Sequence, residues 1–160
     1  MGKVLRKFIN GYPGAVSRSA DNIIISVRNA AGTEIPFGAP VFLVSGQNAC
    51  RLFEADVTEP EMFLGIAVRA ADKTPDVYGS SEAAYGTGDP VDVLVRGSTV
   101  LAMDSAAAPG AGVYLRKTDG KAVASEGTEG TTVRLPGVTV RTARDSARRC
   151  EVVVARRNIL

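Results

Sequence analysis

The chain has 160 residues, a formal net charge of +2 and no histidine. This length suits one ordinary domain, and so small a charge excess gives no indication of a nucleic-acid or membrane partner. The lack of histidine excludes the Ser-His-Asp and Cys-His nucleophile systems, together with the commonest general base and metal ligand. We therefore expect a binding protein and not an enzyme, with no catalytic residues.

The sequence shows no signal for membrane insertion or export. No apolar run approaches the roughly 20 residues of a membrane-spanning helix, and Asn10, Gly11 and Pro13 interrupt the basic N-terminus before a signal-peptide core can form. The simplest interpretation is a protein made and kept in a cytoplasm. In that compartment the two distant cysteines, Cys50 and Cys150, are expected to be free thiols, with a strand-to-strand disulfide as the alternative.

No cofactor or metal motif is present. The GxG sequences at residues 86–88 and 110–112 lack a third glycine at the required spacing and a following helix. The carboxylates of residues 54–76 lack the Asp-x-Asp-x-Asp-Gly spacing of a calcium loop, and a zinc site would need carboxylates to complete two distant cysteines. We expect no cofactor and no metal, and interpret these carboxylates as a solvated acidic face.

Residues 1–21 are expected to form an extended N-terminal arm. Basic and apolar residues are mixed there, no helical period persists, and the stretch breaks at Tyr12-Pro13-Gly14. Exposed apolar residues are costly unless they dock on a partner, so the arm is the best candidate for a contact surface, with a frayed terminus as the alternative. The candidate contacts in the arm are Lys3, Arg6, Lys7, Phe8, Ile9 and Tyr12.

From residue 22 onward the pattern indicates short strands. The run Ile23–Val27 is rich in β-branched residues and ends at a turn signal, and Val41–Val44 follows two prolines. Residues 62–69 are expected to form a deeply buried strand, in which Gly65 marks a bulge or a close approach of another backbone.

A hairpin is predicted further along the chain, because residues 91–96 and 99–103 flank a turn at Gly97-Ser98. Further strands are expected at residues 113–116, 133–140 and 151–154. About eight to ten short strands favour an all-β fold, a small β-barrel or β-sandwich of short strands with an extended N-terminal arm. Residues 22–160 are then a single β domain.

Residues 70–89 are expected to form a long loop of small and polar residues. Loops of this length in a compact domain are usually functional or flexible. We therefore interpret this loop as a second candidate contact surface, with Tyr78 and Tyr85 as the candidate contact residues.

Four arginines gather around Asp145 near the end of the chain. They are Arg141, Arg144, Arg148 and Arg149. Such a group could hold phosphate or the carboxylates of a partner. The alternative is a solvated hairpin end, and the scarcity of aromatic residues argues against single-stranded nucleic acid as the partner.

Four stretches of the chain resemble the structural cement, or decoration, proteins of tailed-bacteriophage capsids. They are residues 35–41, 63–69, 85–97 and 110–115. The resemblance covers roughly residues 22–124, and its motifs are turn-and-strand signatures with no catalytic element. The arm and the arginine-rich end lie outside it.

This resemblance implies a structural protein of the virion that binds the outer surface of the assembled shell and stabilises contacts between major capsid protein subunits. Such proteins are commonly trimers and sometimes dimers, so self-association as a homotrimer is expected, with a dimer as the alternative. Assembly would take place in the host cytoplasm, without nucleic acid or membrane. The other candidate functions are a tail or baseplate β-module and a small β-barrel ligand-binding domain.

Overall fold

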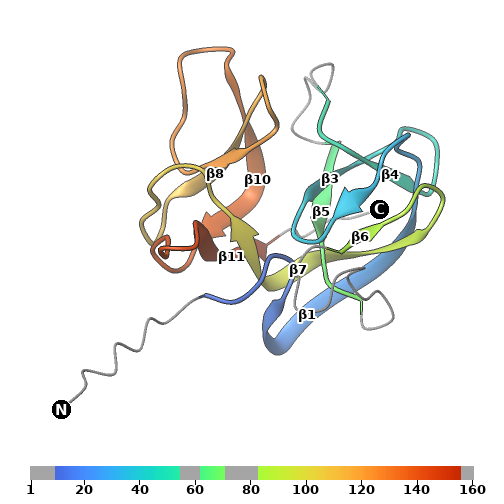
Figure 1. Ribbon diagram of the computed structural model, residues 1–160, viewed down its shortest axis with the longest axis horizontal. Coiled ribbons are helices and arrows are strands. Elements are labelled where there is room, and N and C mark those ends of the chain that lie inside the picture. The colour runs from blue at the N-terminus through green and yellow to red at the C-terminus, as the bar shows by residue number, and fades with distance from the viewer. Residues whose placement is uncertain (1–9, 55–61, 71–82, 156–160) are drawn as a thin grey trace.

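The computed structural model describes residues 10–54, 62–70 and 83–155 (Figure 1). These ranges contain strands and no α-helix, which confirms the all-β prediction. None of the described residues belongs to a helix that could span a membrane. The strands are β1 (Val16–Asn29), β2 (Ile35–Pro36), β3 (Pro40–Leu43), β4 (Ala49–Leu52), β5 (Phe63–Ala67), β6 (Ala84–Tyr85), β7 (Pro90–Ala102), β8 (Gly112–Arg116), β9 (Ala122–Val123), β10 (Thr132–Val140) and β11 (Arg149–Ala155).

One group of strands closes into a small barrel. Its order is β1, β4, β3, β5 and β7, and β7 pairs with β1 again to complete the circle. The pairings are antiparallel except that of β1 with β4, which is parallel and covers only Arg28 and Asn29 of β1. The prediction of a small β-barrel is confirmed for this part of the chain.

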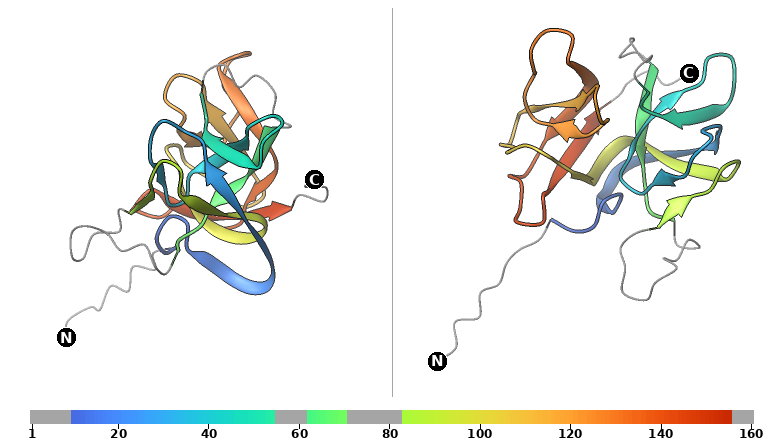
Figure 2. Two further views of the ribbon diagram at one scale, coloured as in Figure 1. Left: turned by 90° about the vertical axis from the view of Figure 1, so that its right-hand side faces the viewer. Right: turned by 45° about the horizontal axis from the view of Figure 1, so that its top comes forward.

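The remaining long strands form a second lobe. β7 continues out of the barrel and pairs with β11, which is followed by β10, β8 and β9. The two lobes stand side by side in Figure 1 and remain separate in the right-hand view of Figure 2, with β7 passing between them. A small pair of strands, β2 and β6, belongs to the barrel side.

β7 is one continuous strand over Pro90–Ala102, so the predicted hairpin at Gly97-Ser98 is wrong. One edge of β7 pairs with β1, while the other edge passes from β5 to β11 near Arg96. Gly97 lies at this handover with a φ of 127°, and the side chain of Asn22 occupies the space that a Cβ would need. The glycine therefore bends a strand and admits a neighbour, and does not reverse the chain.

β5 is buried along its whole length because both of its faces are covered. Leu64 and Ala67 belong to a hydrophobic cluster within the barrel. Phe63 and Ile66 belong to a second cluster, which joins the outside of the barrel to β8, β10 and β11. Burial on both faces explains why this strand is an uninterrupted apolar run and does not alternate with polar residues.

Gly65 lies at the closest approach of β5 to β7. A Cβ at this position would overlap the carbonyl oxygen of Leu94 and lie 2.8 Å from Cγ1 of Val93. The pairing of β3 with β5 also shifts register beside Gly65, between Val41 and Phe42. The predicted close backbone approach is therefore confirmed.

The N-terminal region differs from the expected arm. Strand β1 begins at Val16, inside the stretch of residues 1–21. Before it, Gly14 and Ala15 already exchange backbone hydrogen bonds with Val100 of β7. The pairing of β1 with β7 shifts register between Val16 and Ile23. These irregularities remove the period-two signal by which the start of the strand could have been recognised.

Both cysteines are free, as expected, and they lie buried on different strands. Cys50 of β4 belongs to the cluster within the barrel, and Cys150 of β11 to the cluster between the lobes. Burial raises the pKa of each thiol to about 11. Both thiols therefore stay protonated and unreactive at neutral pH.

We predict that Gly65→Ala destabilises the protein by about 1–3 kcal/mol, because the added methyl forces β5 and β7 apart in a core that cannot absorb it. Urea unfolding followed by circular dichroism measures the change. Gly32→Ala is the matched control, because a Cβ there meets nothing within 4 Å. Equal stability of the two variants would contradict the tight β5–β7 contact.

Candidate functional site

Asn10, at the base of the N-terminal segment, is fixed to the loop between β10 and β11. Its backbone N–H donates to Oδ2 of Asp145 at 2.8 Å. Its side-chain Nδ2 donates to the carbonyl oxygens of Arg149 at 2.8 Å and Ala143 at 3.1 Å. The hydroxyl of Thr142 donates to its Oδ1 at 3.1 Å. All polar groups of this asparagine except its carbonyl are thus used to hold the chain in place.

Asp145 is the acceptor around which this loop is organised. Besides Asn10, its carboxylate accepts the backbone N–H groups of Ala147 and Arg149, each at 2.9 Å. Burial by itself raises the pKa of Asp145, but these three N–H groups, together with the charge of Arg149, outweigh it and leave the pKa below its usual value. The anchor therefore depends on an ionised carboxylate.

The ring of Tyr12 contacts the guanidinium groups of two arginines, Arg69 and Arg149. The guanidinium of Arg149 lies 4.8 Å from the ring centroid and that of Arg69 lies 5.9 Å from it. Arg69 also lies 5.0 Å from the ring of Phe37, and Arg149 donates to the carbonyl of Gly11 at 3.0 Å. The ring is thus oriented by cation–π contacts while 48% of the residue remains exposed.

Gly14 brings the segment into contact with the barrel. Its N–H donates to Val100, and its carbonyl accepts the N–H of Arg69, both at 2.9 Å. Its φ is 76°, and a Cβ would lie 2.8 Å from the backbone nitrogen of Gly38. The break at Tyr12-Pro13-Gly14 is therefore the point where the N-terminal segment locks onto the two lobes.

The exposed large hydrophobic residues of the described chain all follow this anchor closely. They are Tyr12, Val16, Ile23 and Ile24, with 39–50% of each residue exposed.

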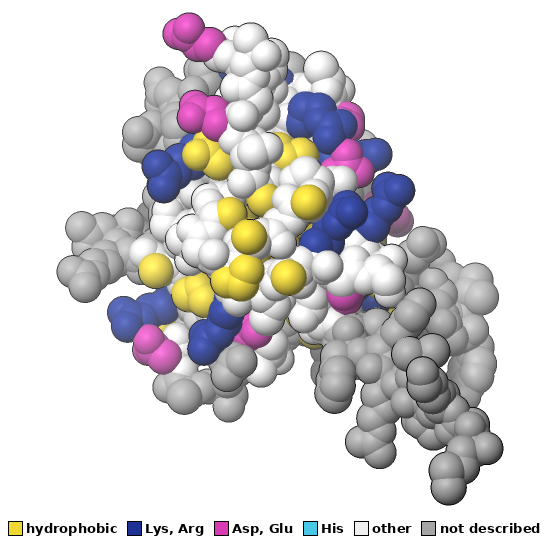
Figure 3. Space-filling model, turned by 90° about the vertical axis from the view of Figure 1, so that its left-hand side faces the viewer, with side chains coloured by type: hydrophobic (Ala, Val, Ile, Leu, Met, Phe, Trp, Pro, Cys, Tyr) yellow, Lys and Arg dark blue, Asp and Glu magenta, His cyan; other side chains and the backbone are white. Residues whose placement is uncertain are grey.

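On the face of the second lobe in Figure 3, hydrophobic side chains gather near the middle, and lysines, arginines and carboxylates surround them. Exposed apolar groups gathered in this way are typical of a surface that contacts a partner.

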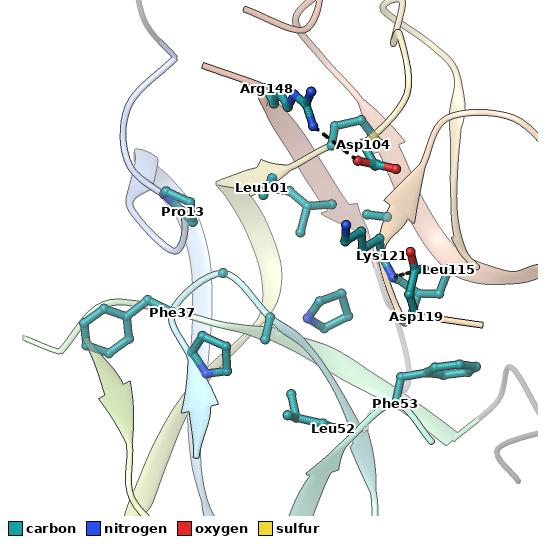
Figure 4. Close-up of a pocket in the computed structure, with 18 residues that line it drawn as sticks. Pro13, Phe37, Leu52, Phe53, Leu101, Asp104, Leu115, Asp119, Lys121 and Arg148 are labelled. Carbon is teal, nitrogen blue, oxygen red and sulfur yellow. Dashed lines mark hydrogen bonds and ion pairs between the residues drawn. The ribbon is translucent and has the colours of Figure 1, made fainter. Parts of the chain in front are cut away.

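A groove of about 560 Å³ separates the two lobes (Figure 4). Phe37, Leu52 and Phe53 line it from the barrel side, and Leu101 and Leu115 line it from the second lobe. The groove is thus apolar in its depth and could receive a hydrophobic side chain.

Three of the charged residues that line the groove, Asp104, Asp119 and Arg148, form ion pairs. Arg116 binds Asp104 at 2.5 Å and Asp119 at 2.8 Å, and Arg148 lies 3.7 Å from Asp104. The hydrogen bond from Arg116 is the main cause that lowers the pKa of Asp104. In the part of the chain that the structure describes, no group of three or more His, Cys, Asp or Glu side chains could hold a metal.

The structure describes two of the predicted contact residues, Tyr12 and Tyr85. Tyr12 is exposed, as a contact residue must be. Tyr85 is only 1% exposed: its hydroxyl donates to the carbonyl of Val68 at 2.6 Å and its ring packs edge-on against Phe37. Tyr85 is therefore a core residue, and its interpretation as a contact is corrected. The others, Lys3, Arg6, Lys7, Phe8, Ile9 and Tyr78, lie outside the described residues.

The arginines near Asp145 mainly bind within the chain. Arg144 donates to the carbonyl oxygen of Asp104 at 2.9 Å, and Arg148 pairs with the same aspartate. Asp145 itself accepts backbone N–H groups of the loop. Arg144 and Arg148 thus hold residues 141–149 to the end of β7. Asp145 and Arg149 hold the same residues to the base of the N-terminal segment. Sequence reasoning missed this role because Asn10 and Asp145 are 135 positions apart and share no motif.

Taken together, these features define a structural binding protein: a two-lobed β scaffold with an anchored N-terminal segment and apolar groups exposed beside it. The sequence profile of the structural cement proteins (E217 gp24/Pam3 gp6) matches residues 3–156. The chain therefore belongs to the structural cement protein family, which confirms the resemblance noted from its sequence and its role as a structural protein of the phage capsid.

A solved phage capsid structure shows the same fold. A chain in the capsid of Myoviridae Phage XM1 aligns with a TM-score of 0.72 and 18% identity, covering 96% of both chains. The N base of head fiber gp8.5 of bacteriophage phi29 aligns with a TM-score of 0.43 and 14% identity, covering 86% of this chain and 99% of that one, which is too weak to establish a shared fold. A search of curated proteins finds no significant match.

We predict that Asp145→Asn lowers the free energy of unfolding by about 1–3 kcal/mol at pH 7, because an amide presents one N–H₂ group to backbone donors that need an acceptor. The pKa of Asp145 is lower in the folded state than in the unfolded state. Its ionised carboxylate therefore contributes its full stabilising free energy above the unfolded pKa of about 3.9. That contribution is lost as the pH falls through the folded pKa. The difference between wild type and variant should therefore be constant from pH 6 to 8 and shrink below about pH 4.

Urea unfolding at several pH values measures this difference. Asp21→Asn serves as the control, because Asp21 forms an exposed ion pair with Arg96 and such pairs contribute little. A loss of stability that stays the same down to pH 2 would show that Asp145 does not act as an ionised acceptor.

Proposed function

We propose that the protein binds the outer surface of the assembled phage shell and stabilises contacts between major capsid protein subunits. Membership of the structural cement family carries this proposal, because it implies association with capsid proteins and places the chain in the virion. The exposed apolar residues on and before β1 support it, since they provide a surface suited to another protein.

The proposed mechanism is preferential binding to the assembled state. A ligand that binds only the assembled shell stabilises it in proportion to the logarithm of ligand concentration over Kd. Each copy needs only a modest interface, because many copies bind one shell and their contributions add. A protein with two lobes linked by a shared strand can span neighbouring subunits without rearranging, which limits the entropy lost on binding.

The N-terminal residues 1–9 are the proposed extension of this contact. Lys3, Arg6 and Lys7 carry positive charge, and Phe8 and Ile9 are apolar. Asn10 fixes the point from which this segment leaves the core. A fixed starting point at Asn10 limits the entropy that the residues before it lose on binding.

We also propose that the protein self-associates, as a trimer or a dimer, that it is assembled onto shells in the host cytoplasm, and that it is not an enzyme. The absence of histidine from the sequence and the pairing of the charged groups around the groove support a non-catalytic role. No cofactor is required for it.

We predict that deleting residues 1–9 lowers capsid affinity at least tenfold and leaves the thermal unfolding midpoint unchanged within about 2 °C. Co-sedimentation with undecorated capsids measures affinity, and circular dichroism measures stability. Deleting residues 1–20 should in addition destabilise the fold, because it removes the bonds of Asn10, Gly14 and Ala15 to the core.

A variant with Lys3, Arg6 and Lys7 all changed to Gln separates the contribution of charge from that of apolar contact. If the chain lacking residues 1–9 binds shells as tightly as the full chain, the N-terminal segment has no part in the interface.

A further inference from the structure

Asn10 and Gly11 form the one asparagine–glycine pair in the sequence. The other asparagines, Asn22, Asn29, Asn48 and Asn158, precede isoleucine or alanine. Asparagine is a thermolabile residue, because the backbone nitrogen of the next residue can attack its Cγ and displace the side-chain amide. A following glycine favours this attack, since it has no Cβ to obstruct the approach and lets the backbone rotate freely. The most labile asparagine of the chain thus lies at the base of the N-terminal segment.

The fold requires both residues of this pair. The side chain of Asn10 donates from Nδ2 to the carbonyl oxygens of Ala143 and Arg149. Its Oδ1 accepts the hydroxyl of Thr142, so that only an amide satisfies all three partners. Gly11 has a φ of 110°, a backbone conformation that other residues rarely adopt. The labile pair is therefore a consequence of the anchor, and replacing either residue costs hydrogen bonds or backbone strain.

The hydrogen bonds that hold Asn10 also slow the reaction. Attack by the nitrogen of Gly11 on Cγ requires the side chain to rotate towards the backbone that follows, and the bonds of Nδ2 and Oδ1 oppose this rotation. The backbone N–H of Asn10 is fixed as well, by Oδ2 of Asp145 at 2.8 Å. The reaction thus waits for local opening of the anchor, which needs less free energy than unfolding of the whole domain.

From these contacts we propose that Asn10 is a deamidation site whose rate is set by the opening of its anchor. In the open state the nitrogen of Gly11 loses its proton to hydroxide and forms a bond to Cγ of Asn10, and Nδ2 takes a proton from solvent and leaves as ammonia. Water then hydrolyses the resulting succinimide. Cleavage of the new N–Cγ bond gives aspartate, and cleavage at the original backbone carbonyl gives isoaspartate, in which the main chain passes through Cγ.

Neither product fits the anchor. A carboxylate at position 10 has no hydrogen to donate, so its oxygens face the carbonyl oxygens of Ala143 and Arg149, and the carboxylate of Asp145 lies close by. The guanidinium of Arg149 offsets part of this repulsion. Isoaspartate also inserts a main-chain atom between the N–H that binds Asp145 and the carbonyl of Gly11 that binds Arg149. Deamidation therefore releases the base of the N-terminal segment, and the lost ammonia makes the release irreversible.

Peptide mapping by mass spectrometry measures the conversion in purified protein held at mildly alkaline pH. Asn48, which is exposed and precedes alanine, is the internal control. We expect aspartate and isoaspartate to accumulate at Asn10 and not at Asn48. Thr142→Val and Asp145→Asn should each accelerate the conversion roughly tenfold, because each removes hydrogen bonds of the anchor. Gly65→Ala, which weakens the β5–β7 contact and leaves the anchor intact, should convert at the wild-type rate.

Circular dichroism checks that all three variants remain folded. The proposal is overturned if Asn10 stays unconverted in both anchor variants, if these variants convert no faster than the wild type, or if Asn48 converts as fast as Asn10. Equal acceleration by Gly65→Ala would also overturn it, because the reaction would then proceed through global unfolding and not through the anchor.

Hydrogen exchange tests the release. Ion exchange separates the deamidated protein, because it carries an additional negative charge. Amide hydrogens of residues 10–15 should exchange at least tenfold faster in this product than in the unmodified protein, since Gly14 and Ala15 bond to the core directly after the lost anchor. Unchanged exchange would contradict the release. These measurements use the protein without capsids, so their outcome is independent of the proposed function.

Discussion

The fold depends on one strand, β7, that the barrel and the second lobe share. β7 pairs with β1 on one edge, while its other edge passes from β5 in the barrel to β11 in the second lobe. Neither lobe can separate without breaking the ladder of the other, and a single hydrophobic cluster spans the barrel wall and the second lobe. The bend at Gly97 makes this sharing possible, because only a residue without Cβ leaves room for Asn22 beside the strand.

This shared strand also positions the surfaces that we assign to binding. Gly14 and Ala15 bond to β7, and Asn10 bonds to Asp145 in the loop that leads into β11. The base of the N-terminal segment and the start of β1 are therefore held in place by the same core. A cement protein needs this property, since a scaffold that does not deform on binding loses little entropy and transfers its interface energy to the shell.

The sequence predicted the fold class and the buried strand around Gly65, because runs of β-branched and apolar residues have a direct meaning in a sheet. It misjudged Gly97, since a glycine between two alternating runs looks alike whether it turns a chain or bends a strand. The sequence analysis placed Tyr85 on the surface because the residues around it are small and polar, but the side chain of Tyr85 packs in the core. The anchor between Asn10 and Asp145 could not be foreseen, because a contact across 135 positions leaves no local pattern.

The most direct test of the capsid role compares assembled shells with unassembled coat protein. The purified protein is mixed at increasing concentration with undecorated capsids of its phage, or with free major capsid protein, and the bound fraction is measured by sedimentation. We predict saturable binding to shells at a fixed number of copies, at least tenfold tighter than binding to free subunits, together with a higher melting temperature of the shell. Binding to neither form, or equal affinity for both, would contradict a cement function.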